Sequence, residues 1–197
     1  MKSLDYGVIG NCRSAALISK TGSIDWFCFP DFDSPSIFSK LLDEKIGGSF
    51  SIEVSQAYAV KQKYVERTNI LCTRYESAEG IFELFDFMPR YRTSDTTYYM
   101  APEIDRYIRY VSGTPRFRIR YDPRMNYARE QAVHRKFKEY IRTSSVSNDR
   151  DNIYLYSGID FDDILEQREI TLTKDEFLLL SYNQKLIPIN IKRILLD

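Results

Sequence analysis

The sequence predicts an all-β protein, an antiparallel β-sandwich of the super-sandwich type with one short helix near residues 35–46. Aromatic residues make up 14% of the chain, with 15 Tyr and 12 Phe, and these residue types favour strands. Several stretches alternate apolar and polar residues with the period of two that marks a half-buried strand. At 197 residues and 43% hydrophobic content, the chain can bury one core. We therefore expect a single sandwich domain over residues 1–184.

The first predicted hairpin lies near the start of the chain. Apolar runs at residues 15–19 and 24–29 are separated by a short polar segment. Gly22 in that segment can supply the positive φ of a tight turn. Residues 29–35 then alternate aromatic, proline and carboxylate side chains, a composition typical of a rigid exposed loop.

Residues 34–46 carry the signals of a short helix. Ser34 can cap free backbone N–H groups, and Pro35 is tolerated at the first helical position. Apolar residues recur at helical spacing as far as Ile46, and a glycine pair follows. We expect this helix to close one end of the sandwich, with its apolar side turned inward.

The remaining strands are expected from alternating patterns with turn signals between them. Residues 88–102 are polar and bounded by proline, and they predict a long loop. Gly113 and Pro115 predict a hairpin between two long strands. The pattern of residues 132–142 fits either a helix or a basic strand. The expected strands cover residues 6–9, 49–54, 57–65, 69–76, 81–87, 103–112, 116–122, 153–156, 169–173 and 177–182.

Charge and cysteine content exclude several functional classes. Lys plus Arg and Asp plus Glu number 28 each, so no net field would draw the protein to nucleic acid or to an anionic membrane. No apolar run reaches the ~20 residues of a membrane span, and the first residues lack a secretory signal, so we expect a cytoplasmic location. Three cysteines without CxxC spacing and a single histidine, His134, indicate no metal site and no cofactor.

Three motifs near the start of the chain resemble a known family. They are YGVIGNCR at residues 6–13, GSIDW at 22–26 and PDFDSP at 30–35. With them, the chain resembles the amino-terminal domain of glycoside hydrolase family 15 proteins of the bacterial and archaeal glucoamylase and trehalase type. Further matching segments lie at residues 64–75, 83–89 and 118–127.

The resemblance implies a β-sandwich that precedes a helical (α/α)6 barrel. In such enzymes the barrel holds the catalytic carboxylates, which hydrolyse α-glucosidic bonds with inversion. The resemblance therefore implies no catalytic residue in this chain, and a barrel in the same or a separate polypeptide as its partner. The apolar tail at residues 185–197 would then begin a linker toward the barrel. A final edge strand is the alternative for this tail.

The loop region contains three carboxylates, Asp25, Asp31 and Asp33. Glycoside hydrolysis normally needs two carboxyl groups on either side of the scissile bond, and bunching on one short segment argues against such a pair. Stabilisation of the loop or an interdomain hydrogen bond is the expected role. We expect Asp25 to accept backbone N–H bonds near the hairpin end, and either Asp33 or Ser34 to cap the predicted helix.

Three other residues are candidates for a substrate pocket or an interdomain surface. Asn11 and Arg13 follow a glycine bend and could reach a pocket built on a neighbouring domain. Arg13 could equally pair with Asp25 or Asp33. Trp26 could stack on a sugar ring, although its alternating strand favours burial in the core.

These observations support the hypothesis of a non-catalytic domain that packs on a family 15 barrel and helps shape a pocket for trehalose or an α-glucan. The alternatives are a free-standing carbohydrate-binding module, or a subunit that pairs with a separately encoded catalytic chain. An enzyme in its own right is a third hypothesis, which the missing opposed carboxylate disfavours.

Overall fold

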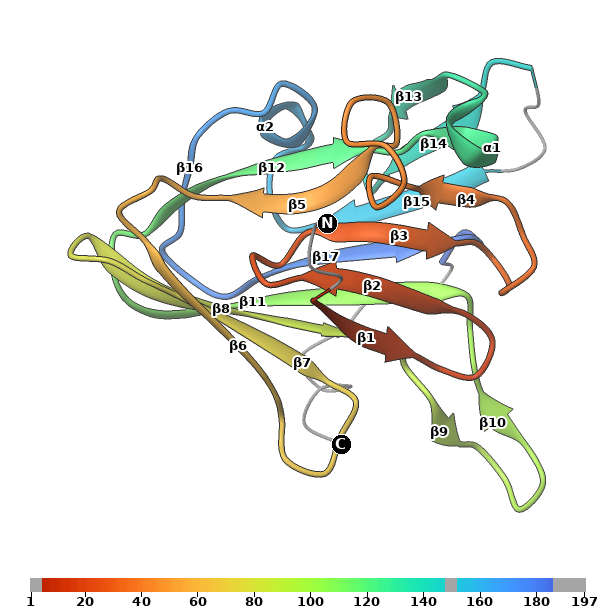
Figure 1. Ribbon diagram of the computed structural model, residues 1–197, viewed down its shortest axis with the longest axis horizontal. Coiled ribbons are helices and arrows are strands. Elements are labelled where there is room, and N and C mark those ends of the chain that lie inside the picture. The colour runs from red at the N-terminus through yellow and green to blue at the C-terminus, as the bar shows by residue number, and fades with distance from the viewer. Residues whose placement is uncertain (1–4, 148–151, 186–197) are drawn as a thin grey trace.

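The computed structural model describes residues 5–147 and 152–185, and it has the predicted all-β architecture of two large antiparallel sheets packed face to face (Figure 1). The seven-stranded sheet has the order β1-β2-β3-β5-β12-β16, with β4 paired to β3. Its strands are β1 Tyr6–Gly10, β2 Ala15–Ser19, β3 Ile24–Cys28, β4 Ser36–Phe38, β5 Ser49–Glu53, β12 Arg116–Asp122 and β16 Ile170–Thr171.

The eight-stranded sheet has the order β13-β14-β15-β17-β11-β8-β7-β6. Its strands are β6 Ala59–Tyr64, β7 Leu71–Glu76, β8 Gly80–Phe87, β11 Glu103–Gly113, β13 Ala132–Lys136, β14 Ile141–Ser145, β15 Asn152–Ser157 and β17 Glu176–Ser181. The other elements are a small hairpin of β9 Tyr91–Arg92 and β10 Tyr98–Tyr99, and the short helices α1 Met125–Ala128 and α2 Phe161–Leu165.

One apolar core fills the space between the sheets. Phe27 and Phe50 from the seven-stranded sheet meet Phe82 and Ile108 from the eight-stranded sheet, and all four are fully buried. Burying a side chain of this size contributes about 1.5–3 kcal/mol relative to leaving it exposed. Strand β12 has the predicted alternation, with apolar side chains in this core and arginines outside.

A buried ion pair of the eight-stranded sheet holds an arginine that reaches across this core to the other sheet. Arg106 on β11 donates from Nε to Asp86 Oδ1 on β8 at 2.7 Å, and both side chains are fully buried. The guanidinium also donates across the interface to the backbone carbonyls of Phe50, at 2.7 Å, and Gly22. Its carbon lies 4.8 Å from the centre of the Phe50 ring. One charged side chain therefore holds strands of both sheets.

The helix predicted near residues 35–46 is wrong. Ser36–Phe38 form strand β4, and turns follow it. The backbone N–H of Leu41 donates to the carbonyl of Asp25 on the neighbouring strand at 3.0 Å, so it is unavailable to a helix. Leu42, part of the supposed apolar stripe, is 71% exposed. Pairing with β3 has overridden the local helical pattern.

The hairpin predicted around Gly113 is also wrong. Strand β11 lies between β8 and β17, whereas β12 lies between β5 and β16 in the other sheet. Gly113 does adopt the positive φ that the turn signal implied, at 74°. The neighbouring Thr114 N–H donates to the carbonyl of Glu79 at 2.8 Å. The turn therefore carries the chain from one sheet to the other.

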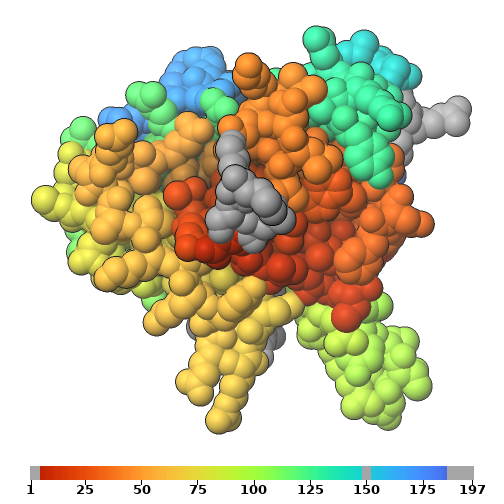
Figure 2. All heavy atoms as spheres, in the orientation of Figure 1, coloured from red at the N-terminus to blue at the C-terminus, as the bar shows by residue number. Residues whose placement is uncertain are grey.

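Three further segments complete the comparison with the sequence. The undecided segment 132–142 contains strand β13 and the turn into β14. The predicted loop at 88–102 contains the β9–β10 hairpin, which projects from the body of the domain (Figures 1 and 2). The tail at 185–197, predicted as a linker or an edge strand, lies outside the described residues except for Lys185.

Removing one partner of the buried ion pair should destabilise the fold strongly. In Asp86→Ala, Arg106 would stay in the core without a counter-ion, so we expect the free energy of unfolding to fall by about 3–5 kcal/mol. Urea unfolding followed by the fluorescence of Trp26, the single tryptophan, measures this change.

The matched control removes a carboxylate from the exposed pair of Arg116 and Glu169, whose closest atoms are 3.7 Å apart. Glu169→Ala should change the free energy of unfolding by less than about 1 kcal/mol. If Asp86→Ala lowered the free energy of unfolding by as little as Glu169→Ala, the buried pair would not be holding the sheets together.

Candidate functional site

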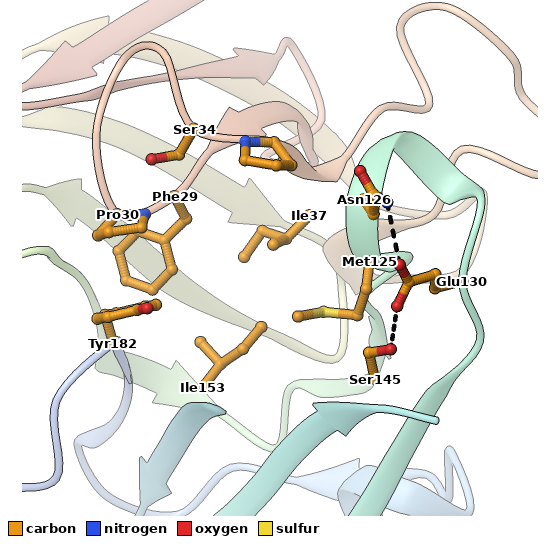
Figure 3. A pocket seen from close by; sticks show the side chains of 11 residues that line it. Phe29, Pro30, Ser34, Ile37, Met125, Asn126, Glu130, Ser145, Ile153 and Tyr182 are labelled. Atoms are coloured by element: carbon orange, nitrogen blue, oxygen red, sulfur yellow. Dashed lines mark hydrogen bonds between the residues drawn. The ribbon is translucent and has the colours of Figure 1, made fainter. Parts of the chain in front are cut away.

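A hollow lies between the loop at residues 29–35 and the turn that contains α1 (Figure 3). Its volume of about 440 Å³ falls within the range of small-molecule pockets. Phe29 and Tyr182 form an aromatic side, with ring centres 5.8 Å apart and ring planes at 89°. The lining residues are Phe29, Pro30, Ser34, Pro35, Ile37, Met125, Asn126, Glu130, Ser145, Ile153 and Tyr182.

Three consecutive residues with left-handed backbone shape one wall of the hollow. Asn126, Tyr127 and Ala128 have φ angles of 52°, 57° and 60°, which residues other than glycine seldom adopt. The turn directs Asn126 Nδ2 to Glu130 Oε1, at 3.0 Å. The Tyr127 hydroxyl donates to the carbonyl of Ser34 at 3.5 Å. This turn and the loop are therefore joined at the rim.

Glu130 presents a charged acceptor to the hollow. Its Oε2 accepts hydrogen bonds from the hydroxyls of Ser145 and Ser147, the second at 2.5 Å. These two bonds, and then the bond from Asn126, hold the pKa of Glu130 below its usual value. The carboxylate is therefore ionised at neutral pH, and it is suited to accept hydrogen bonds and not to act as a proton donor.

The predicted candidates Asn11, Arg13 and Asp31 lie together beside the loop. Asn11 is buried, and its Oδ1 accepts two backbone N–H groups of its own bend. Its Nδ2 donates to the carbonyl of Ala101 at 2.9 Å. Arg13 Nε pairs with Asp31 Oδ1 at 2.5 Å. Asn11 therefore holds the bend, and the ion pair holds the loop against it.

None of the six candidates predicted from the sequence belongs to the lining of the hollow, Asp25, Trp26 and Asp33 included. Asp33 is exposed and has no helix to cap, and neither it nor Asp25 is the partner of Arg13. Asp25 is buried at the start of β3, where its carboxylate accepts the hydroxyls of Ser23, at 2.5 Å, and Tyr6, at 3.1 Å, in place of the expected backbone N–H groups. Trp26 is only partly buried and belongs to neither apolar cluster of the described chain, so its expected burial in the core is wrong.

The hollow lacks a pair of opposed carboxyl groups among the residues that the structure describes. Glu130 is the one carboxylate in its lining, and hydrolysis of a glycosidic bond normally takes two. Within residues 5–147 and 152–185, no group of three or more His, Cys, Asp or Glu side chains could hold a metal ion. In the same part of the chain, no helix has the length and apolar character to cross a membrane. What the hollow offers is hydrogen bonding and an aromatic surface.

Sequence reasoning missed four residues that matter most to the hollow. Met125 and Asn126 belong to the segment 118–127 that matched the family motifs, and this match was the available signal. Glu130 and Tyr182 carried no local signal, because the turn before β13 and the end of β17 bring them to the hollow from distant parts of the chain.

The fold is that of a β-sandwich domain. Among its described residues, the hollow is large enough for a small molecule but lacks a catalytic pair of carboxylates. A family model described as trehalase-like, N-terminal, matches residues 5–174. The chain belongs to this family of trehalase-like N-terminal domains, and the resemblance of its opening motifs is confirmed.

Curated relatives of the chain are trehalases of much greater length. A trehalase of Thermoplasma volcanium is 35% identical over 132 residues, which cover 65% of this chain and 20% of that protein. A trehalase of Thermoplasma acidophilum is 37% identical over 120 residues, or 59% of this chain and 20% of that protein. Trehalase 2 of Sulfolobus acidocaldarius is 45% identical over 86 residues, which cover 44% of this chain and 14% of that protein. The chain spans no more than about a fifth of the length of each of these three relatives. No solved structure matches it.

Asn11→Ala should loosen the bend beside the hollow. It would leave two backbone N–H groups and the carbonyl of Ala101 without their partner, at a cost of about 1–3 kcal/mol in the free energy of unfolding. Thermal or urea unfolding measures this loss. Asp33→Ala, which alters an exposed carboxylate of the adjoining loop, should leave stability nearly unchanged. Equal effects of the two substitutions would contradict the role given to Asn11.

Proposed function

We propose that this domain packs on the catalytic barrel of a trehalase-type glycosidase, in the same polypeptide or a separate one, and that the hollow and loop 29–35 face the barrel's substrate pocket. The observation that carries the proposal is the family match over residues 5–174 beside relatives about five times longer than the matched part. The rest of such a relative has room for a catalytic domain. Trehalose or an α-glucan is the proposed substrate of the assembled enzyme.

The rim of the hollow supports this choice of face. Phe32 at the loop tip is 60% exposed, and Tyr127 on the opposite wall is 44% exposed. Large aromatic side chains of this kind are frequent hot spots of protein interfaces. The Arg13–Asp31 ion pair and the Tyr127–Ser34 hydrogen bond hold both walls in place. Such preorganisation lowers the entropy lost on docking.

The chemistry of the hollow also favours an accessory role. Glu130 is ionised and already accepts three hydrogen bonds from its neighbours. It could accept another from a sugar hydroxyl or from a polar group of the barrel. The acid and base of hydrolysis would both come from the partner domain.

A free-standing carbohydrate-binding module is the second candidate function. The observation that favours it is the combination of the Tyr182 ring and the Glu130 carboxylate in a hollow of about 440 Å³. Aromatic faces and charged acceptors are the groups that bind sugars. This candidate requires the isolated chain to bind sugar, which the docking proposal does not.

Phe32→Ala should weaken docking without affecting the fold. We expect its affinity for the portion of the Thermoplasma volcanium trehalase outside the matched region to fall about tenfold, as for a moderate hot spot. Titration calorimetry measures the dissociation constant, and circular dichroism checks that the variant is folded.

The control is Phe137→Ala. Phe137 is also exposed, at 42%, but lies in the turn between β13 and β14 and does not line the hollow. Its loss should leave the dissociation constant unchanged. The docking face would be misplaced if both variants lost affinity equally. Docking itself would be refuted if the unaltered chain bound no better than an unrelated β-sandwich.

Sugar titration of the isolated chain separates the two candidate functions. If the hollow is one wall of a shared pocket, trehalose and maltose should show no saturable binding to the isolated chain up to about 10 mM. Any binding would then have a free energy weaker than about −3 kcal/mol. Saturable binding that Tyr182→Ala abolishes, while Trp26→Ala retains it, would favour the carbohydrate-binding module. Binding lost in Trp26→Ala alone would place a sugar site on β3.

A further inference from the structure

Glu130 supplies the one charge in the lining of the hollow, among the residues that the structure describes. The other described lining residues are apolar, aromatic or uncharged polar, and they include no Lys, Arg or His. The neighbouring Arg129 is exposed and lies outside the lining. The hollow therefore carries a negative charge that no described lining residue compensates.

Neighbouring side chains satisfy most of the hydrogen bonds of this carboxylate, but not its charge. Asn126, Ser145 and Ser147 donate to it, and all three are neutral donors. These bonds hold the pKa of Glu130 below its usual value, and no described cation contributes to that shift. A carboxylate has about four acceptor sites, so Glu130 can accept from a further donor. A donor with a positive charge forms a stronger bond there than a neutral one.

The rest of the hollow is mainly apolar. Figure 3 shows the aromatic pair of Phe29 and Tyr182 at one end and Glu130 at the other, with three apolar side chains between them, Ile37, Met125 and Ile153. Long cationic side chains pack their aliphatic stems on apolar surface while the charged group reaches a polar partner. The hollow therefore has the two kinds of surface that such a side chain needs.

The same lining favours arginine over the other groups that could enter. An anion would be repelled by Glu130, and Pro30 and Pro35 have no backbone N–H to donate to it. The guanidinium of arginine is more weakly hydrated than the ammonium of lysine, and its donors match a carboxylate. A hollow of about 440 Å³ has the size of a small-molecule pocket, which is enough for one arginine side chain.

The rim of the hollow indicates that the arginine belongs to a protein. Phe32 and Tyr127, on opposite walls, are 60% and 44% exposed. Aromatic residues and arginine are enriched among the hot spots of protein interfaces. A protein that inserts an arginine would also cover these two rings, whereas a small cation would leave them in water.

We infer that the hollow receives an arginine side chain of the docking partner, with its guanidinium at Glu130 and its aliphatic stem on Ile37, Met125 and Ile153. This inference rests on the proposed function, because it takes the hollow to face the catalytic barrel. The hollow then contributes to docking through charge as well as through aromatic contact.

Binding of a small arginine probe to the full chain tests the chemistry of the hollow. The probe is N-acetyl-arginine methylamide, and its control is the citrulline analogue, which has the same shape without the charge. In NMR titrations at low salt, we expect the arginine probe to shift the amide signals of residues 125–130 and to bind about tenfold more tightly than the citrulline probe. Equal binding of the two probes, or no shift from either, would overturn the inference.

Glu130→Gln removes the charge and keeps an oxygen acceptor for its neighbours. It should lower the affinity for the arginine probe about tenfold, to that of the citrulline probe. The control Glu139→Gln alters an exposed carboxylate in the turn between β13 and β14, outside the lining, and should leave both affinities unchanged. An equal loss in the two variants would show attraction by general charge and overturn the inference. The comparison of the two probes uses the unaltered chain, so it decides the matter even if Glu130→Gln does not fold.

Docking separates this inference from the proposed function. With the portion of the Thermoplasma volcanium trehalase outside the matched region, Glu130→Gln should raise the dissociation constant about tenfold at low salt, and by less as salt is added. If Phe32→Ala weakens docking and Glu130→Gln does not, the inference is overturned and the proposed function stands. If the unaltered chain does not dock, the proposed function falls, and the probe titration decides whether the hollow takes a guanidinium group.

Discussion

The buried pair of Arg106 and Asp86 is the interaction on which the arrangement of the two sheets depends. Apolar packing between sheets is not directional, whereas the guanidinium has fixed donor directions and meets Asp86 in one sheet and the Phe50 carbonyl in the other. Its bond to the Gly22 carbonyl also holds the turn between β2 and β3. Burying this charge is costly, so we interpret it as a device that sets how the sheets lie on each other.

The candidate site inherits its geometry from that arrangement. Strand β3 starts after the turn held by Arg106 and ends at Cys28, and loop 29–35 follows directly. The opposite wall, with Glu130, follows β12 of the same sheet, and Tyr182 arrives from the end of β17 in the other sheet. The hollow is thus assembled from both sheets, and its shape depends on their relative position.

Much of the fold could be predicted from the sequence because the signals were local. Gly22 and the flanking apolar runs specified the first hairpin, and alternation specified β12. The helix near residues 35–46 failed because strand pairing and the bond from Leu41 to Asp25 outweigh apolar spacing. The hairpin at Gly113 failed because a turn signal does not state which sheet the next strand joins. For the site, the sequence indicated Asn11, Arg13 and Asp31, which hold the bend and loop 29–35 and do not line the hollow. Glu130, which does line it, was missed because its contacts form only in the folded chain.

The central claim is that the loop and turn around the hollow form the face that docks on a catalytic barrel. Hydrogen exchange of the domain, alone and mixed with the portion of the Thermoplasma volcanium trehalase outside the matched region, tests it directly. The account predicts slower backbone exchange on mixing at residues 29–35 and 125–130, with the β13–β14 turn unchanged. Protection confined to other surfaces, or no protection at concentrations that saturate binding, would contradict it.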